Sequence, residues 1–428
     1  MGRNQSRCVG VLQGDWEWVG YTRGRMGNEL IYLDNAATCW PKPPEVGEAM
    51  SAFLRDSAGN PGRGGHELAR AASATVDEAR ETLARLVNAP ATKRIVLTHG
   101  CTDALNIANH GIMRSAMVES CGGEKPRVVT SCLEHNAVLR TRHCYATGGL
   151  IELDVISCGG DGLIDPDEYL ACCDERTILA CLTHASNVVG TIQETGRVGK
   201  GLRERSPHAL FLVDVAQTIG HMPIDAEAGY ADLMAIAGHK GLRGPTGTGG
   251  LYVGERAYPD DPDSPRLFCE RRGGTGMKGV GLDMPTELPD ALEAGTANAV
   301  GFAGMLAAVE AKCETEHHTE RALTERMLSG LRATDGVTVY GLPGVDGRTA
   351  VVLFNIDGAH PREAADRLDR EFSIAVRGGV HCAPLAHNAI GTGEDGAVRA
   401  SVGPCNEPAC VDALLDAVAV IAADPVVH

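Results

Sequence analysis

The sequence lacks any long hydrophobic run, and its positive charges are few. No apolar stretch approaches the ~20 residues that a helix needs to cross a bilayer, and the first twenty residues lack the apolar core of a signal peptide. Lys and Arg number 39 against 56 Asp and Glu, which gives a net charge of -17. Nucleic acids and anionic membrane surfaces repel such a polyanion. We therefore expect a cytoplasmic protein that binds neither nucleic acid nor a membrane.

The fifteen cysteines include no Cys-x-x-Cys pair, and their number is odd. Zinc sites and disulfide frameworks need regularly spaced ligands or pairs, so the sequence predicts no metal site. In a reducing compartment most of these cysteines are expected to be small buried hydrophobic residues or exposed bystanders. Composition does not distinguish a cysteine with a chemical role from the others.

Short β-branched runs alternate with amphipathic stretches from about residue 94 to residue 253. Alternation of this kind predicts a mainly parallel sheet that is covered by helices on both faces. In such open sheets, ligands bind beyond the carboxyl ends of the strands. The expected strands are 94–98, 127–131, 150–156, 177–183, 210–216 and 232–237, and the expected helices include 104–117 and 136–146.

The pattern changes after residue 301, where a long helix to about residue 332 is expected. Strands at 337–340 and 350–356 and a helix at 361–372 then predict a smaller α+β unit. We expect residues 1–30 to be an N-terminal extension, either a loosely held tail or the product of a mis-set start. Residues 31–280 are expected to form the large domain, whose first residues could pack with the small domain, and 281–428 the small domain.

A lysine between glycines, in the sequence Gly238-His239-Lys240-Gly241, follows the expected strand 232–237. Because glycine lets the backbone approach a ligand closely, such a lysine can form a Schiff base with a carbonyl cofactor. An ordinary surface lysine is the alternative. Asp214, at the end of an apolar strand, favours the cofactor, because pyridoxal enzymes use an acid to keep the pyridine nitrogen protonated.

Other polar residues also follow expected strands. His135 could stack on a cofactor ring and transfer protons, or it could simply begin a helix. Cys101 and Thr102 open a helix whose N-terminal amides, with the Thr102 hydroxyl, could bind a phosphate, although threonine also caps many helices. Asn187 could donate a hydrogen bond to a ring oxygen or belong to a turn. Their shared position predicts a single site.

The segment Arg377-Gly-Gly-Val-His381-Cys382 places a cysteine in a glycine-rich loop beside two basic residues. Nearby cations favour the thiolate, which is the reactive form of cysteine. We therefore predict that Cys382 is a nucleophile. Arg399, in an expected short strand, suits bidentate binding of a substrate carboxylate, with a surface ion pair as the alternative.

Together these segments resemble the class V aminotransferase family, and specifically its cysteine desulfurase branch. The resemblance covers nearly the whole chain from Ile31. It implies a fold-type-I enzyme that uses pyridoxal phosphate and works as a homodimer, with a mainly parallel seven-stranded sheet in a large domain and a smaller α+β C-terminal domain. Further motifs that carry it are 32–38 (YLDNAAT), 60–66 (NPGRGGH), 273–276 (GGTG), 293–298 (EAGTAN) and 381–387 (HCAPLAH).

The resemblance also implies a role for each candidate residue by its position. The cofactor would be held covalently by Lys240 and contacted by the following residues: Asp214 at the pyridine nitrogen, His135 on the ring, Gln217 and Asn187 at the ring oxygen, Cys101, Thr102 and His239 around the phosphate, and Thr275 at the phosphate of the other subunit's site. The substrate would be bound by Arg399, Asn35, Arg377 and His381, and its sulfur taken by Cys382.

The activity implied is that of a pyridoxal-phosphate-dependent cysteine desulfurase. L-Cysteine would yield L-alanine and a persulfide on Cys382, and the sulfur would pass to an unidentified acceptor protein, as in iron–sulfur cluster assembly. A selenocysteine lyase, or another pyridoxal-dependent carbon–sulfur or carbon–selenium lyase, is the main alternative, because fold alone does not separate these activities. A non-catalytic scaffold that binds the cofactor is a further alternative, disfavoured by the intact Lys240, Asp214 and Cys382.

Overall fold

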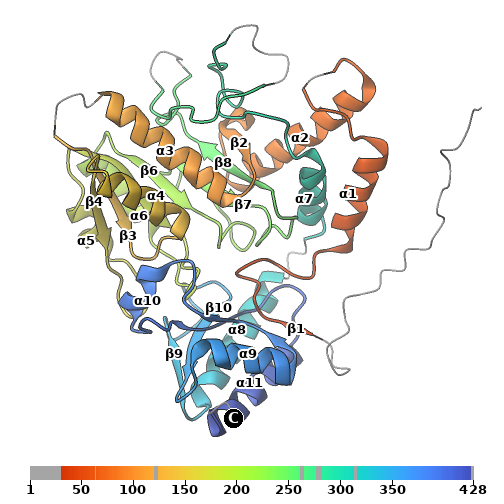
Figure 1. Cartoon of the computed structure of the whole chain (residues 1–428), viewed down its shortest axis with the longest axis vertical. Helices are drawn as coiled ribbons and strands as arrows, with labels where there is room; N and C mark the ends of the chain where they lie inside the picture. Colours follow the sequence, from red (N-terminus) through yellow and green to blue (C-terminus); the bar gives the residue numbers. More distant parts are fainter. Residues whose placement is uncertain are drawn as a thin grey trace, which may run out of the picture.

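The computed structural model describes residues 30–62, 64–119, 124–260, 265–275, 282–312 and 316–425. The expected N-terminal extension lies outside these ranges except for its last residue. In Figure 1 a large part built around a central sheet lies above a smaller part, which is drawn in blue and contains the C-terminal helix. The site described below depends on where these two parts meet.

The central sheet has seven strands and is mostly parallel, which confirms the predicted fold class. The spatial order is β2-β8-β7-β6-β5-β3-β4, and β8 alone is antiparallel to its neighbours. All six expected strands are present, some of them one or two residues shorter than expected. Their bounds are β2 Ile95–Thr98, β3 Arg127–Ser131, β4 Glu152–Ile156, β5 Thr177–Thr183, β6 Leu210–Asp214, β7 Leu233–Ala237 and β8 Gly249–Val253.

Helices cover both faces of this sheet, so its inner strands are buried on both sides. Along β6, Phe211 and Val213 belong to one apolar cluster, and Leu210 and Leu212 belong to the other. The first cluster includes residues of α2 (Glu67–Leu86) and α7 (Ala299–Glu310), and the second includes residues of α3 (Cys101–Glu119) and α4 (Asn136–Thr147). The remaining helices of this part are α1 (Pro44–Asp56), α5 (Pro166–Ala171) and α6 (Thr195–Arg205).

The smaller part contains a four-stranded antiparallel sheet in the order β12-β13-β10-β9. The short strand β1 (Ile31–Tyr32) pairs in parallel with β11 (Ile374–Ala375), so the start of the described chain packs with the small part. The sheet strands are β9 Val337–Tyr340, β10 Val351–Ile356, β12 Arg377–Gly379 and β13 Ala397–Ser401, and the helices are α8 Glu316–Ala333, α9 Pro361–Phe372, α10 Pro384–Ile390 and α11 Pro408–Ala423.

The prediction of one continuous helix from residue 301 to about residue 332 is wrong, because α7 ends at Glu310 and α8 begins at Glu316. The two helices bury apolar side chains in different cores. Phe302 of α7 lies in a core cluster of the central sheet, whereas Met327 of α8 lies in the core of the small part. Helical periodicity continues through both segments, so the pattern alone did not reveal the break. The domain boundary at residue 280 remains a prediction.

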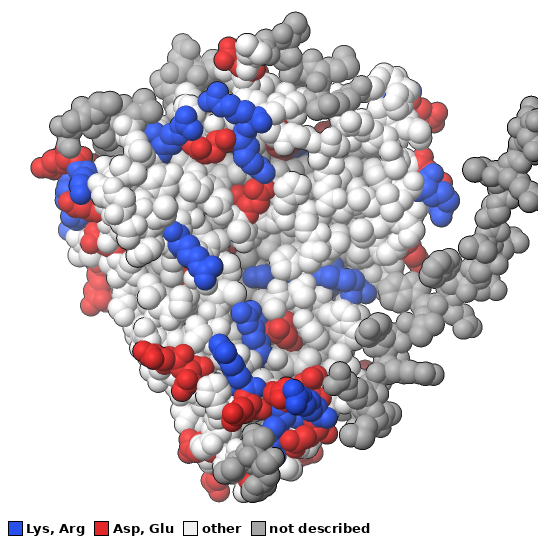
Figure 2. Space-filling model, in the orientation of Figure 1, with Lys and Arg blue, Asp and Glu red and all other residues white. Residues whose placement is uncertain are grey.

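Four further observations on the described residues concern membrane spans, metal ligands, cysteines and surface charge. No helix there has the length and apolarity of a membrane span, and no group of three His, Cys, Asp or Glu side chains is placed to hold a metal ion. The cysteines described there are all free thiols. Figure 2 shows acidic and basic side chains interspersed on the face in view, most densely over the small part.

Candidate active site

A cavity of about 640 Å³ lies between the carboxyl ends of the central strands and the small part. Asp214 ends β6 and Thr183 ends β5 on one side of it, while Arg377 of β12 and Arg399 of β13 lie on the other. Convergence at the carboxyl edge of a parallel sheet is the arrangement that the sequence predicted. The predicted site residues that line this cavity are Cys101, Thr102, His135, Asn187, Asp214, Gln217, His239, Lys240, Arg377, Cys382 and Arg399.

Lys240 and Asp214 lie at the same edge because β6 and β7 are adjacent and parallel, with Asp214 beside Ala235. Burial lowers the pKa of Lys240, and the negative charge of Asp214 opposes this shift. A lowered pKa favours the neutral amine, the form that attacks a carbonyl carbon. The Asp214 carboxylate accepts hydrogen bonds from the Ala216 backbone at 2.9 Å and from Sγ of Cys101 at 3.3 Å.

Cys382 lies in the loop between β12 and α10, against residues of the large part. Its carbonyl oxygen accepts a hydrogen bond from the Asn136 backbone N–H at 2.7 Å, and its Sγ lies 3.3 Å from Nη2 of Arg377. A hydrogen bond from His135, followed by that from Arg377, lowers the pKa of Cys382 to about 6 against the opposing effect of burial. Cys382 is therefore largely a thiolate at neutral pH.

The protonation of His135 fits this role. His135 is the N-cap of α4, and its Nδ1 accepts a hydrogen bond from the Ala137 backbone N–H at 3.0 Å. A neutral imidazole that accepts at Nδ1 carries its proton on Nε2. The ring N–H that remains for the sulfur of Cys382 is therefore that of Nε2. One residue thus begins a helix, as one interpretation of the sequence held, and also stabilises the thiolate. Its stacking on a cofactor ring remains a prediction.

Arg399 is buried, so the alternative of a surface ion pair is wrong. Its Nη2 lies 2.6 Å from Oδ1 of Asp34, and its Nη1 donates to the carbonyl oxygen of Asn187 at 2.9 Å. Its Nε has no hydrogen-bond partner among the described residues. Sequence reasoning missed Asp34, which stands 365 positions away in the chain. The pair holds the guanidinium at the cavity wall, where an additional anionic ligand can approach it.

The start of α3 and His239 also line the cavity. Gly100 precedes the helix with φ +142°, a conformation that side-chain residues rarely adopt, and so it allows the helix to begin at Cys101. Nδ1 of His239 lies 3.1 Å from Oγ1 of Thr38, and burial lowers the pKa of His239 to about 4. A helix N-terminus beside a neutral hydrogen-bonding ring suits a phosphate group.

Three predicted site residues do not line this cavity. Asn35 fixes local structure, since its amide donates to the carbonyl oxygen of Ser401 at 3.1 Å and to Oδ1 of Asn406 at 3.3 Å. His381 precedes Cys382 in the same loop, and its buried ring is stacked on that of His387 with ring centroids 5.1 Å apart. Thr275 is half-buried at the end of the described range 265–275. Their predicted roles in binding remain predictions.

Glu134 is a second residue that sequence reasoning missed. Its buried carboxylate accepts hydrogen bonds from Oγ of Ser131 at 2.7 Å and from the Thr183 backbone N–H at 2.9 Å, and so joins the ends of β3 and β5 beneath His135. Burial raises the pKa of Glu134 to about 7. The position of Glu134, between an apolar strand and a helix, could have indicated a buried acid in the sequence. A buried carboxylate needs hydrogen-bond partners, so it would be expected to join neighbouring segments.

Comparison with known sequences gives matches over most of the chain. The model of the family described as aminotransferase class-V matches residues 31–414. A probable cysteine desulfurase from Methanothermobacter thermautotrophicus is 33% identical over 87% of this chain and 90% of its own length. A probable cysteine desulfurase from Halalkalibacterium halodurans is 35% identical over 83% of this chain and 85% of its own length.

Solved structures with the same fold also cover most of the chain. The apo structure of a cysteine desulfurase from Thermococcus onnurineus NA1 superposes with a TM-score of 0.82 at 30% identity, over 92% of this chain and 95% of that one. The cysteine desulfurase CsdA from Escherichia coli, in an S-sulfonic acid form, gives a TM-score of 0.79 at 29% identity over 93% and 96%.

Proposed function

The chain belongs to the class-V aminotransferase family, and from this membership we propose that it is a pyridoxal-phosphate-dependent cysteine desulfurase. It converts L-cysteine into L-alanine and leaves the sulfur as a persulfide on Cys382. The observation that carries the proposal is the pairing of Lys240 with a thiol of lowered pKa, that of Cys382, in one cavity. Relatives at 33% and 35% identity that are named as probable cysteine desulfurases support it.

The residues around the cavity fit pyridoxal phosphate. Lys240 supplies an amine for the aldehyde, and Asp214 supplies a buried carboxylate for the pyridine nitrogen. The start of α3 suits the phosphate. The amide nitrogen of Gln217 donates to the Ala36 carbonyl at 3.0 Å and keeps a second hydrogen for a ring oxygen. When bound, the cofactor withdraws electrons from the substrate carbon, which makes cleavage of the carbon–sulfur bond possible.

The side chains of this chain divide the remaining work. Arg399 binds the carboxylate of the substrate, and Lys240 removes and returns the proton on the substrate α-carbon. The thiolate of Cys382 attacks the substrate sulfur, so that a sulfur–sulfur bond forms and the carbon–sulfur bond breaks. Protonation of the carbon left behind gives alanine. His135 and Arg377 keep Cys382 deprotonated before the attack.

The chain's assembly and partners are part of the same proposal. The enzyme is a cytoplasmic homodimer in which Thr275 contacts the cofactor phosphate of the partner subunit's site. Two-fold dimers are the commonest oligomers. An acceptor protein removes the sulfur from Cys382 and delivers it to a process such as iron–sulfur cluster assembly. A fully active monomer in solution, measured by sedimentation, would contradict the role of Thr275.

One experiment tests the activity. The purified protein is loaded with pyridoxal phosphate and incubated separately with cysteine, selenocysteine and cysteine sulfinate, and alanine is measured together with sulfide or selenide. Alanine and persulfide from cysteine are expected. Turnover of selenocysteine alone would instead indicate a selenocysteine lyase. Borohydride should fix the cofactor on Lys240, and mapping of the adduct to another lysine would contradict the cofactor assignment.

A further inference from the structure

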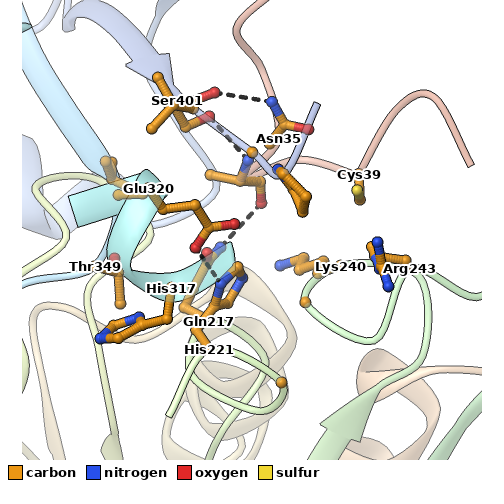
Figure 3. A pocket seen from close by; sticks show the side chains of 18 of the residues that line it. Asn35, Cys39, Gln217, His221, Lys240, Arg243, His317, Glu320, Thr349 and Ser401 are labelled. Atoms are coloured by element: carbon orange, nitrogen blue, oxygen red, sulfur yellow. Dashed lines mark hydrogen bonds and ion pairs between the residues drawn. The ribbon is translucent and has the colours of Figure 1, made fainter. Parts of the chain in front are cut away.

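A second, smaller cavity lies behind Lys240. It has a volume of about 30 Å³ and shares Ala36, Gln217 and Lys240 with the main cavity. Figure 3 shows Lys240 and His221 at the wall of this rear cavity, together with Glu320 of α8. A volume of about 10–15 Å³ is enough for one water molecule when polar partners are present. The rear cavity therefore can hold water in contact with the lysine.

The half-buried His221 and the buried Glu320 form a pair at this cavity. Nδ1 of His221 lies 3.1 Å from Oε2 of Glu320, whose side chain is only 6% exposed. A carboxylate beside Nδ1 accepts a hydrogen bond from the ring N–H there, which leaves Nε2 unprotonated in the neutral ring. Figure 3 draws this contact as a dashed line. The geometry is that of a base oriented by an acid.

The free nitrogen of this ring lies against the backbone beside Lys240. A Cβ atom at Gly241 would stand 2.8 Å from Nε2 of His221 and 2.3 Å from the carbonyl oxygen of Ile219. A side chain at position 241 would therefore displace the ring. The absence of a side chain at Gly241 thus leaves room for the imidazole of His221 beside the lysine segment. The sequence motif around Lys240 did not indicate this role of the glycine.

His221 also reaches a third cavity, which leads away from the active site. This outer cavity has a volume of about 140 Å³ and includes Thr324 and Arg348 in its lining. It shares His221, Glu320 and His317 with the rear cavity. The three cavities therefore follow one another, with Lys240 between the first two and the His221–Glu320 pair between the last two.

We propose that His221 and Glu320 form a proton relay between Lys240 and solvent. The inference rests on the proposed function, in which Lys240 must be a neutral amine when it removes the α-proton of the substrate. The ammonium group of the incoming substrate brings the proton that has to leave Lys240 beforehand. An N–H bond of Lys240 Nζ breaks and its proton passes to a water molecule in the rear cavity, which gives a proton to Nε2 of His221. The imidazolium, paired with Glu320, then releases the Nε2 proton into the outer cavity.

The surrounding charges favour this direction of transfer. Arg243 and Lys312 also line the rear cavity, and their positive charge disfavours a proton that stays on His221. Cys39 lines the cavity as well, but burial raises its pKa to about 11, so it remains a neutral thiol. The lowered pKa of Lys240 makes the loss of its proton easier.

Replacement of His221 by alanine tests the relay, because it removes the base and opens space for a substitute. We expect alanine formation from cysteine to fall about 10- to 100-fold, at the low end of what general bases contribute. Added imidazole should restore most of the loss in proportion to its unprotonated form. His317→Ala is the matched control, because it removes a histidine from the same cavity without touching Glu320, and it should keep its activity.

A second measurement does not depend on turnover. In the cofactor-free protein, ¹⁵N NMR of the ring nitrogens should show His221 protonated at Nδ1 and bare at Nε2, and Glu320→Gln should abolish this preference. A proton on Nε2 overturns the relay. Wild-type turnover by His221→Ala also overturns it. So does a loss of turnover that imidazole does not restore, provided that the variant still binds the cofactor at Lys240. Failure of the wild-type protein to desulfurate cysteine would overturn the proposed function instead, while the NMR result still decides the state of His221.

Discussion

The two walls of the cavity shift the pKa of a cysteine thiol in opposite directions. On the wall formed by the central sheet, burial and the nearby Asp214 raise the pKa of Cys101 far above its usual range. On the wall formed by the small part, hydrogen bonds from His135 and Arg377 lower the pKa of Cys382 to about 6. Both sulfur atoms face the same space, yet only one of them is a thiolate near neutral pH. Local partners, and not shared access to the cavity, decide which cysteine is reactive.

The comparison also shows which part of the molecule lowers the pKa of Cys382. Arg377 belongs to the small part, but His135 and the backbone N–H of Asn136 that hold Cys382 belong to the large part. The largest contribution to the low pKa of Cys382 therefore requires contact between the two parts. Lys240 and Asp214, in contrast, both follow neighbouring strands of one sheet. Loosening of the contact between the parts would weaken the thiolate before it disturbed the lysine.

The largest expected effect comes from exchanging the two cysteines separately for serine. Cys382→Ser should reduce alanine formation from cysteine by at least about 10³-fold, on the scale that enzymes lose with their nucleophile. Cys101→Ser, which keeps a donor for Asp214, should stay within a few-fold of the wild type. Alanine release measured at equal cofactor occupancy checks both variants. Equal losses would show that the comparison between the two walls is mistaken.

The next effect concerns the stability of the small-part wall. Asp34→Asn removes the charge that pairs with the buried Arg399 and should lower the free energy of unfolding by about 2 kcal/mol. This is below the ~3–5 kcal/mol of fully buried pairs, because the Asp34 side chain is 20% exposed. Asp56→Asn is the control, since its pair with Arg55 is exposed and is worth about 0–1 kcal/mol. Urea unfolding of both variants measures the difference.

Sequence reasoning located the sheet-side residues well because a parallel sheet brings its strand ends together. Asp214 and Lys240 each follow an apolar strand, and that order alone places them near each other. The contact of Asp34 with Arg399 carries no such signal, since it joins the first described segment to a strand of the small part. The Glu320–His221 pair was not predicted for the same reason. Its two residues stand 99 positions apart, and no sequence pattern indicates that α8 contacts the central part.

A smaller effect concerns the pH dependence of the Cys382 thiol. In the cofactor-free protein, the rate of alkylation by iodoacetamide should rise with pH with a midpoint near 6, because the lowered pKa gives thiolate above that pH. Arg377→Gln removes a donor and a positive charge, so the midpoint should move upward by about one unit, or ~1.4 kcal/mol. Arg362→Gln is the control, because Arg362 lies beside Gly379 of β12, the strand that carries Arg377, and should leave the midpoint in place. An unchanged midpoint in Arg377→Gln would assign the activation to His135 alone.

The smallest expected effect concerns Cys101, whose thiol donates to Asp214 at 3.3 Å. Cys101→Ala removes this hydrogen bond but leaves the bond from the Ala216 backbone to the same oxygen at 2.9 Å. A single neutral hydrogen bond contributes about 1 kcal/mol, so the affinity for pyridoxal phosphate should change only about five-fold, as measured by absorbance titration. The rate of Cys382 alkylation should not change, because Cys101 lies on the other wall. A loss of affinity of 100-fold or more would mean that Cys101 fixes Asp214 in place and that the sheet-side wall also depends on its own cysteine.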